Sequence, residues 1–234
     1  MLKKFLFASA VLFASVNSFA SEMYVIDSPT TKILNYGSYD VSFRAFSDGG
    51  VHARLDFGVF KFLNLGISWE LGQFLGNKDI KAAVPSISVK FRLYEGDMTL
   101  PGIALGYDGQ GYFYNSDYDG DFKQRGKGLY LVAGRELFFE GLLLDFGLNM
   151  NDFSNPNICV FLNAMVPIYK DSLFFIAEYD NISYFPDARL NAGVRFALTE
   201  STDIDFVIRD CFGKRADDKM PNERVFKVSY TGKF

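Results

Sequence analysis

The chain has 234 residues, of which 49% are hydrophobic and 22% charged, and its formal net charge is −4. This length suggests one domain or at most two, and the composition excludes a disordered chain, a collagen-like repeat and, with only two cysteines, a disulfide scaffold. The aromatic content of 17% comes from 26 Phe and 13 Tyr with one Trp and one His, and this excess needs a physical reason.

Residues 1–20 have the layout of a secretory signal peptide. Lys3 and Lys4 form a positive region, residues 5–16 are apolar, and residues 18–20 place small side chains where signal peptidase cleaves. The apolar stretch is too short to span a bilayer as a helix. Cleavage would change the net charge from −4 to −6, because two Lys and no acid are lost. An acidic chain without a basic block predicts no nucleic-acid partner.

After an arm at 21–37, which we expect in the periplasm, apolar and polar residues alternate strictly to the C-terminus. Val51, Ala53 and Leu55, for example, alternate with His52 and Arg54. Because successive side chains of a strand point to opposite faces, each such segment has one apolar and one polar face. Twelve segments are predicted as strands: 38–46, 51–60, 63–72, 84–94, 100–108, 127–136, 141–149, 157–167, 172–180, 189–199, 202–212 and 223–234.

The lengths of these segments and of their connections favour a membrane barrel. Most segments have nine to twelve residues, which suits the roughly 9–11 residues of a tilted strand crossing a bilayer. The connections alternate between long, polar ones and short ones, as in outer-membrane barrels with short periplasmic turns. We therefore predict an all-β fold, a transmembrane antiparallel up-and-down β-barrel of about 12 strands, over residues 38–234, with both termini in the periplasm of a Gram-negative cell.

The last segment ends in a terminal Phe behind an alternating aromatic strand. This pattern is similar to the recognition signal that outer-membrane barrels present to their assembly machinery, which makes that machinery an expected partner together with membrane lipid and lipopolysaccharide. The outward positions that would carry the signal are Phe226, Val228, Tyr230, Gly232 and Phe234.

Alternation also predicts which charged side chains face the lumen. They have mixed signs, so two interpretations stay open: a narrow channel with charge selectivity, or a lumen filled by mutually paired charges. The predicted lumen-lining residues are Arg44, His52, Arg54, Asp56, Glu70, Lys90, Arg92, Glu178, Arg189, Arg195, Asp205, Arg209 and Lys227.

Catalysis and metal binding have little support in the sequence. His52 is the only histidine available as a general base, and no motif marks a nucleophile beside it, so we predict no enzymatic activity and no cofactor. The loop at 117–121 begins like a calcium loop, but Phe122 and Gly128 stand where such a loop needs Gly and Glu, so we expect no metal site.

Cys159 and Cys211 would both sit in an oxidising compartment. They are predicted on strands three intervals apart, which is too far for a disulfide. We expect two free, buried thiols.

Several phrases resemble the YjbH-like outer-membrane proteins associated with exopolysaccharide and capsule production. They are Ile26-Asp-Ser-Pro-Thr, Pro101-Gly-Ile-Ala-Leu-Gly-Tyr-Asp108, Gly128-Leu-Tyr-Leu-Val-Ala-Gly134, Ala177-Glu-Tyr-Asp180 and Leu190-Asn-Ala-Gly-Val-Arg-Phe196. Typical members are longer, and this chain has room for one barrel. The resemblance implies a non-enzymatic structural or transport barrel linked to polysaccharide export, with polysaccharide or export proteins as partners. A small porin for polar or anionic solutes is the alternative function, and a hydrolase that uses His52 is a third.

Overall fold

The computed structural model describes residues 23–97, 99–115, 121–137, 142–151, 153–154, 156–170, 172–183, 188–212 and 222–234. The predicted signal peptide and the acidic residues Asp117 and Asp119 lie outside these ranges. Among the described residues no helix is long and apolar enough to cross a bilayer.

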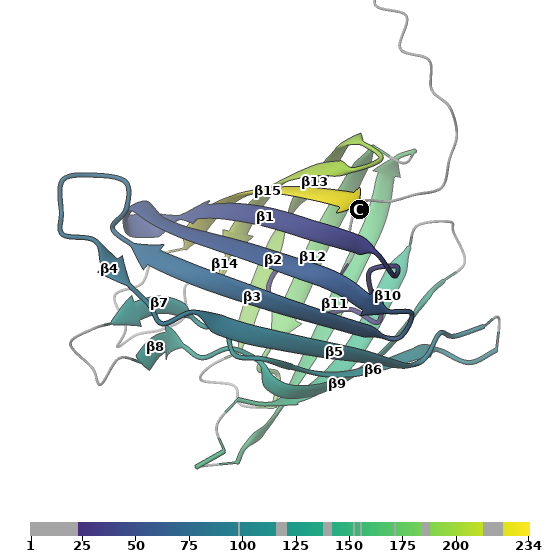
Figure 1. Cartoon of the computed structure of the whole chain (residues 1–234). Coiled ribbons are helices and arrows are strands. Elements are labelled where there is room, and N and C mark those ends of the chain that lie inside the picture. The colour runs from purple at the N-terminus through teal and green to yellow at the C-terminus, as the bar shows by residue number, and fades with distance from the viewer. Residues whose placement is uncertain are drawn as a thin grey trace, which may run out of the picture.

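Twelve long antiparallel strands form one closed barrel (Figure 1). Each segment predicted from alternation corresponds to one of them, and the bounds differ from the prediction by three residues at most. The barrel strands are β1 (Ser38–Phe46), β2 (Gly50–Phe60), β3 (Leu63–Gly72), β5 (Ser86–Tyr94), β6 (Gly102–Asp108), β9 (Gly128–Glu136), β10 (Leu143–Met150), β11 (Ile158–Tyr169), β12 (Leu173–Asp180), β13 (Arg189–Thr199), β14 (Thr202–Arg209) and β15 (Glu223–Lys233).

The barrel closes between its first and last strands. β1 pairs with β15 from Ser38↔Lys233 to Ala45↔Phe226, and β1 also pairs with β2 on its other side. Each of the other barrel strands pairs with the barrel strands before and after it along the chain. The sheet therefore has no open edge among the twelve strands, which satisfies the backbone hydrogen bonds as a bilayer requires.

The two ends of the barrel differ in their connections. We call the end that carries residues 61–62, 95–101, 137–142, 170–172 and 200–201 the short-turn end, and both Ser38 and Lys233 lie there. The opposite, long-loop end carries one tight turn, the 3-10 turn η1 (Ser47–Gly49), and longer connections. One connection contains the short strand β4 (Lys81–Ala82), and another contains the hairpin β7 (Tyr112–Asn115) and β8 (Asp121–Gln124).

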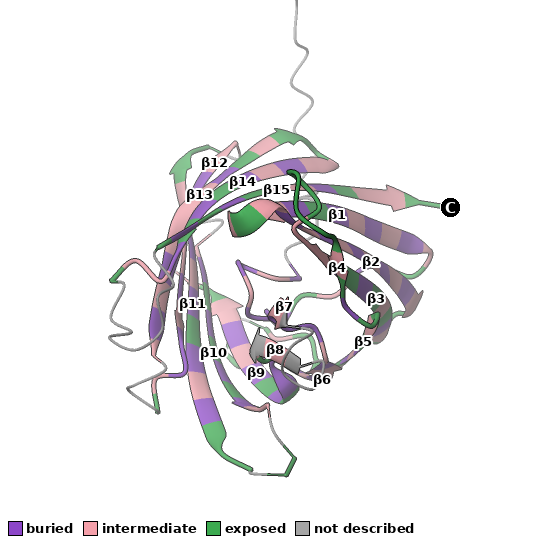
Figure 2. Ribbon diagram, turned by 90° about the vertical axis from the view of Figure 1, so that its left-hand side faces the viewer, coloured by how far each residue is buried: buried purple, intermediate pink, exposed green. Residues whose placement is uncertain are grey.

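Burial alternates along the strands with a period of two, which places an apolar surface on the outside (Figure 2). On β3, for example, Leu65, Ile67 and Trp69 are exposed, whereas Asn64 and Ser68 are buried. Exposed Phe, Leu and Ile side chains also lie on most other strands of the barrel, whereas the outward side chains of β2 and β6 are mostly half-buried. A continuous apolar belt of this kind suits the hydrocarbon core of a membrane.

The interior is mostly polar but also contains two buried apolar clusters, which the sequence prediction did not include. Tyr130 and Val132 of β9 pack with Phe161 and Ala104 in one buried cluster. A second buried cluster joins β1, β10, β11, β12, β14 and β15 to the N-terminal arm and contains Val25, Ile26, Phe46, Leu143, Met165, Phe174, Ile176, Val207 and Val225. The first cluster explains why the segment Leu129–Val132 is apolar on both faces, because the inward Tyr130 and Val132 belong to that cluster.

Candidate functional site

The N-terminal arm lies inside the barrel, a placement that the sequence did not predict. Its described residues 23–36 form a narrow hairpin in which Tyr24 bridges to Pro29, the Val25 amide donates to the Ser28 carbonyl at 3.1 Å, and the Thr30 amide donates to the Met23 carbonyl at 3.0 Å. Most residues from 23 to 31 are buried. The arm therefore lies within the lumen, where Val25 and Ile26 belong to the second apolar cluster.

Side chains of the barrel wall bind the carbonyl groups of this arm hairpin. Arg44 donates to the carbonyl of residue 26 at 2.7 Å, and Arg195 donates to that of residue 25 at 2.9 Å. Lys90 and Asn163 each donate at 3.0 Å, to the carbonyls of residues 23 and 29. Donors from four separate strands therefore hold one short extended segment of backbone.

Acidic side chains of the wall accept hydrogen bonds from the amides of the same segment. Glu178 Oε2 accepts from the amides of residues 27 and 28 at 2.9 and 2.7 Å. Asp145 Oδ1 accepts from the Thr31 amide at 3.2 Å. Burial of a backbone segment costs free energy unless its polar groups are paired, and here the wall supplies both donors and acceptors.

Asp27, at the tip of the arm hairpin, contacts two arginines of the wall. Its carboxylate lies 2.5 Å from Nη1 of Arg44 and 2.8 Å from Nε of Arg209. The ring of Tyr112, on β7, lies against both guanidinium groups, with its centroid 4.1 Å from Arg209 Cζ and 5.1 Å from Arg44 Cζ. Two guanidiniums on one buried carboxylate favour its charged form.

Most other charged side chains of the lumen form ion pairs with side chains of the barrel wall. Arg54 contacts Asp56 at 3.0 Å and Asp108 at 2.8 Å, and the remaining contacts repeat this pattern. These further wall pairs are Arg195–Asp205 at 2.8 Å, Arg209–Glu223 at 2.7 Å, Lys127–Asp180 at 2.5 Å and Arg189–Asp180 at 3.3 Å. Arg44 differs, because within the described residues its only carboxylate at ion-pair distance belongs to the arm.

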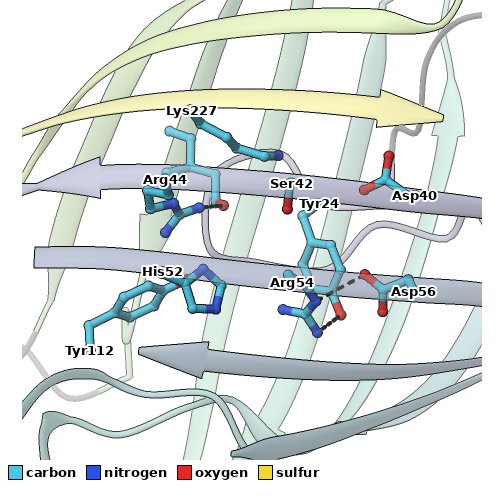
Figure 3. A pocket seen from close by; sticks show the side chains of 10 residues that line it. Tyr24, Asp40, Ser42, Arg44, His52, Arg54, Asp56, Tyr112 and Lys227 are labelled. Carbon is cyan, nitrogen blue, oxygen red and sulfur yellow. Dashed lines mark hydrogen bonds and ion pairs between the residues drawn. The ribbon is translucent and has the colours of Figure 1, made fainter. Parts of the chain in front are cut away.

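A small cavity lies between the arm hairpin and the wall (Figure 3). Its volume is about 20 Å³, which is room for about one water molecule. Figure 3 shows Arg44, His52, Arg54 and Tyr112 around this space, with Tyr24 of the arm directed at Arg54. The arm therefore narrows the lumen at this level.

The hairpin β7–β8 covers the lumen from the long-loop end (Figure 2). The Tyr114 amide donates to Glu70 Oε1 at 2.8 Å, and the ring of Phe113 packs edge-on against Phe46 of β1 at 5.6 Å between centroids. Arg209 donates to Gln124 of β8 at 2.5 Å. The hairpin and the arm therefore meet at the same two arginines.

The residues predicted to line the lumen fall into three groups. Lys227 is mostly buried and faces Asp205 at 3.8 Å, and Arg92 is 24% exposed at the short-turn end, where it donates to the Lys61 carbonyl. The other eleven are buried inside the barrel: Arg44, His52, Arg54, Asp56, Glu70, Lys90, Glu178, Arg189, Arg195, Asp205 and Arg209. The sequence did not single out Asp27, Tyr112, Asp108 or Asp145, although Asp108 and Asp145 follow the inward parity of their strands.

The structure also places His52 and the two cysteines. The His52 ring packs against Tyr112 at 6.0 Å beside the small cavity. Neither cysteine forms a disulfide; Cys159 is buried, but Cys211 is half-exposed because it follows the end of β14 instead of lying within it. The expectation of two buried thiols is therefore wrong for Cys211. Within the described ranges, no group of three or more His, Cys, Asp and Glu side chains is placed to hold a metal ion.

Comparisons with known proteins give structural neighbours only. No family model matches the sequence, and no curated protein does, so the resemblance to YjbH-like proteins finds no support. A solved structure of the KdgM porin is 13% identical, with a TM-score of 0.52 over 82% of this chain and 98% of that chain. The structure of KdgM in complex with disordered oligogalacturonate is 11% identical, with a TM-score of 0.50 over the same shares. At these identities the likeness shows a common fold.

Proposed function

We propose that the protein is a small porin-type channel of a bacterial outer membrane, without enzymatic activity, for small polar solutes and anions among them. The observation that carries this proposal is the lumen itself: a closed 12-stranded barrel surrounds buried charged side chains that no soluble core needs. Buried charges cost free energy and are retained where they serve a function. The likeness to the KdgM porin fold supports the same function.

Location in the outer membrane follows from the physics of the exterior. Exposed rows of Phe, Leu and Ile surround the barrel, and a water-soluble protein rarely exposes apolar patches beyond a few hundred Å². We assign the short-turn end to the periplasm, as in other outer-membrane barrels, which also places both chain termini there after export by the signal peptide at 1–20. The outward Phe226, Tyr230 and Phe234 are exposed and available to the assembly machinery.

Anions are favoured by two basic groups whose binding partners lie on the arm. Arg44 contacts Asp27 and the carbonyl of residue 26, and Lys90 donates to the carbonyl of residue 23. Without the arm these two groups would face the lumen, and so would Glu178 and Asp145, which now bind amides of the arm. The anion preference comes from Arg44, because it lies beside a second guanidinium, that of Arg209, at one level of the lumen. KdgM has been solved with oligogalacturonate, which carries carboxylates, and this supports carboxylated solutes here. Polysaccharide export and hydrolysis by His52 have no comparable support.

The test is conduction by the full chain, purified, refolded in detergent and inserted into planar bilayers. We expect small, discrete conductance steps in KCl, and a reversal potential in a KCl gradient that favours chloride. Arg44→Gln and Lys90→Gln should each shift the reversal potential toward potassium, whereas Lys170→Gln, at an exposed short turn, should leave it unchanged. Silent bilayers despite a correctly folded barrel, judged by heat-modifiable migration on a gel, would contradict the channel function.

A further inference from the structure

We infer that Arg44, Arg209 and Tyr112 form a binding site for a carboxylate of the transported solute, and that Asp27 occupies this site as a displaceable internal ligand. This inference rests on the proposed channel function and adds to it a ligand class and a means of closure. It starts from one observation, the enclosed carboxylate at the tip of the arm.

The site has the geometry of a built carboxylate site. Two guanidiniums from opposite sides of the β1–β15 seam converge on Asp27, one from β1 and one from β14. Arg209 is oriented by Glu223 at 2.7 Å and by Gln124 at 2.5 Å, and the Tyr112 ring packs on both guanidiniums. The two guanidiniums and the ring therefore come from the wall and the β7–β8 hairpin, and the arm contributes the Asp27 carboxylate together with the residue 26 carbonyl that binds Arg44.

The arm can leave without rearrangement of the barrel, because the hairpin enters and returns by the same end. Residue 37 lies at the short-turn end, where its amide donates to the Gly58 carbonyl at 3.0 Å and its carbonyl accepts from the Phe234 amide at 3.0 Å. The tip reaches Arg209 at the long-loop end of β14, and residue 23 is back beside Lys90 in the middle of β5. Withdrawal toward the short-turn end therefore breaks no strand pairing.

Gly58 is shaped for the passage of the arm. A Cβ atom added at this position would lie 2.0 Å from the carbonyl oxygen of Asn35, so no other residue allows the arm to run so close to β2. By contrast, a Cβ at Gly72 on the neighbouring strand would meet nothing closer than 3.5 Å. We expect Gly58→Ala to loosen the arm and Gly72→Ala to leave it seated.

A disulfide between arm and wall tests whether the arm closes the channel. A Cβ at Gly102 would lie 3.4 Å from the Cβ of Thr31, close to the roughly 3.5–4.5 Å of disulfides, although it also lies 2.9 Å from the Glu95 carbonyl oxygen. The variant Thr31→Cys/Gly102→Cys is made with Cys159→Ala and Cys211→Ala, and Gly102→Cys alone, with the same contact to Glu95, is the matched control. Thr31→Cys/Asp145→Cys is a second pair, since the Thr31 hydroxyl lies 3.4 Å from Asp145 Oδ1.

The same channel is recorded oxidised and then reduced with dithiothreitol. We expect the oxidised form to be silent and the reduced form to conduct like the single-cysteine control. Equal conductance in both forms, with the disulfide verified by mass spectrometry, would overturn the closing role of the arm and leave the channel function intact. Failure of both pairs to oxidise in folded protein would contradict the position of the arm. If no form conducted, the reduced form and Gly58→Ala included, the result would instead count against the channel function.

The carboxylate site is tested by competition with sodium galacturonate as the probe. In Asp27→Asn the internal ligand is weakened, so the channel should open more often, and galacturonate should block its chloride current. Adding Arg44→Gln should raise the half-blocking concentration about tenfold or more, because a charge-assisted hydrogen bond is lost. Lys170→Gln in the same background should change it less than about twofold, as expected for an exposed charge.

A second variant keeps this test decisive if Arg44→Gln disturbs folding. Arg209→Lys retains the charge beside Glu223 but loses the planar contact with Tyr112 and Asp27, so it should also weaken the block. Galacturonate block that is equal in Asp27→Asn and in both arginine variants, all folded, would overturn the site. Block that depends on neither Asp27 nor the arginines would place any anion binding elsewhere in the lumen.

Discussion

The guanidinium of Arg195 joins two strands and the arm. It binds Asp205 through Nε at 2.8 Å and Nη2 at 2.9 Å, and it donates to the carbonyl of residue 25 at 2.9 Å. Its burial makes this pair sensitive, because a buried charge left without a partner is far more costly than a broken surface pair.

We predict that Arg195→Gln lowers the free energy of unfolding by about 3–5 kcal/mol. The matched change Arg92→Gln breaks a 3.4 Å pair with Glu95, which is 78% exposed, and should cost about 0–1 kcal/mol. Urea unfolding in detergent micelles, followed by fluorescence, compares the two. Equal losses would show that the Arg195 contact contributes no more than a surface pair.

Asp97 organises a short turn outside the membrane. Its Oδ1 accepts hydrogen bonds from the amides of Thr99 at 2.6 Å and Leu100 at 2.8 Å, and its Oδ2 accepts from the Tyr94 hydroxyl. The hydrogen bond from Tyr94 and those from the two amides hold the pKa of Asp97 below its usual value. A carboxyl group with a lowered pKa stabilises the folded turn above the ordinary Asp pKa, and this contribution is lost as the pH falls through the lowered value.

The turn should therefore stay intact at pH 5 and open only below the normal titration range of Asp. The amide chemical shifts of Thr99 and Leu100, followed by NMR in micelles, should share one midpoint below that of an unperturbed Asp. A midpoint at or above the ordinary value would contradict the hydrogen-bonded carboxylate. In Asp97→Asn the two shifts should no longer follow this titration.

At the level of strands, β10 and β11 show how the lumen is filled. Gly147 pairs with Phe161, and a Cβ added at Gly147 would lie 2.0 Å from the Phe161 ring. Phe161 is fully buried and receives the Lys127 ammonium over its ring at 4.9 Å. The glycine thus gives its space to the aromatic ring across the strand pair.

We predict that Gly147→Ala destabilises the barrel by about 1–3 kcal/mol, the usual cost of overpacking. Phe161→Leu in the same chain should recover part of this loss by freeing the space. The double variant should therefore lose less unfolding free energy than the sum of the two single losses. A double-mutant cycle from urea unfolding in micelles measures the coupling. Additive effects would mean that the ring and the new methyl group do not meet.

The strands themselves could be predicted because alternation reports a physical fact about each residue, namely which side of the sheet it occupies. The strand bounds and the inward parity of Arg44, Arg54 and Arg195 follow from it. Loop lengths then indicate the up-and-down order. The alternation and the loop lengths are both local in the sequence, so a single sequence is enough to reveal them.

The occupants of the lumen could not be predicted in the same way. The arm has no regular secondary structure, and its bonds to Glu178 and Asp145 span 150 and 114 residues. The hairpin that carries Tyr112 lies in a loop whose sequence does not indicate that it folds inward. In the sequence, the apolar interior around Tyr130 shows only as an irregular alternation. Phe161, which belongs to the same cluster as Tyr130, lies on a different strand.

As a whole, the molecule is a barrel whose lumen carries two inserts, the arm and the β7–β8 hairpin. The wall pairs most of its own charges, so withdrawal of the arm would leave a mainly neutralised passage in which the bases Arg44 and Lys90 and the acids Glu178 and Asp145 lose their contacts with the arm. This combination favours a channel that is weakly selective overall but binds carboxylates at one level. A lumen filled by paired charges and a channel are therefore compatible. The first describes the barrel with the arm inside, and the second describes the barrel with the arm withdrawn.

Trp69 gives this barrel an intrinsic optical reporter. It is the only tryptophan in the chain, its indole is 45% exposed on the outer face of β3, and its Nε1–H donates to the Ala83 carbonyl at 2.6 Å. All tryptophan emission thus comes from one point on the lipid-facing surface. On insertion into vesicles the emission should shift to shorter wavelength, and lipids brominated along their acyl chains should quench it. Emission that neither shifts nor is quenched would mean that this face of the barrel remains in water.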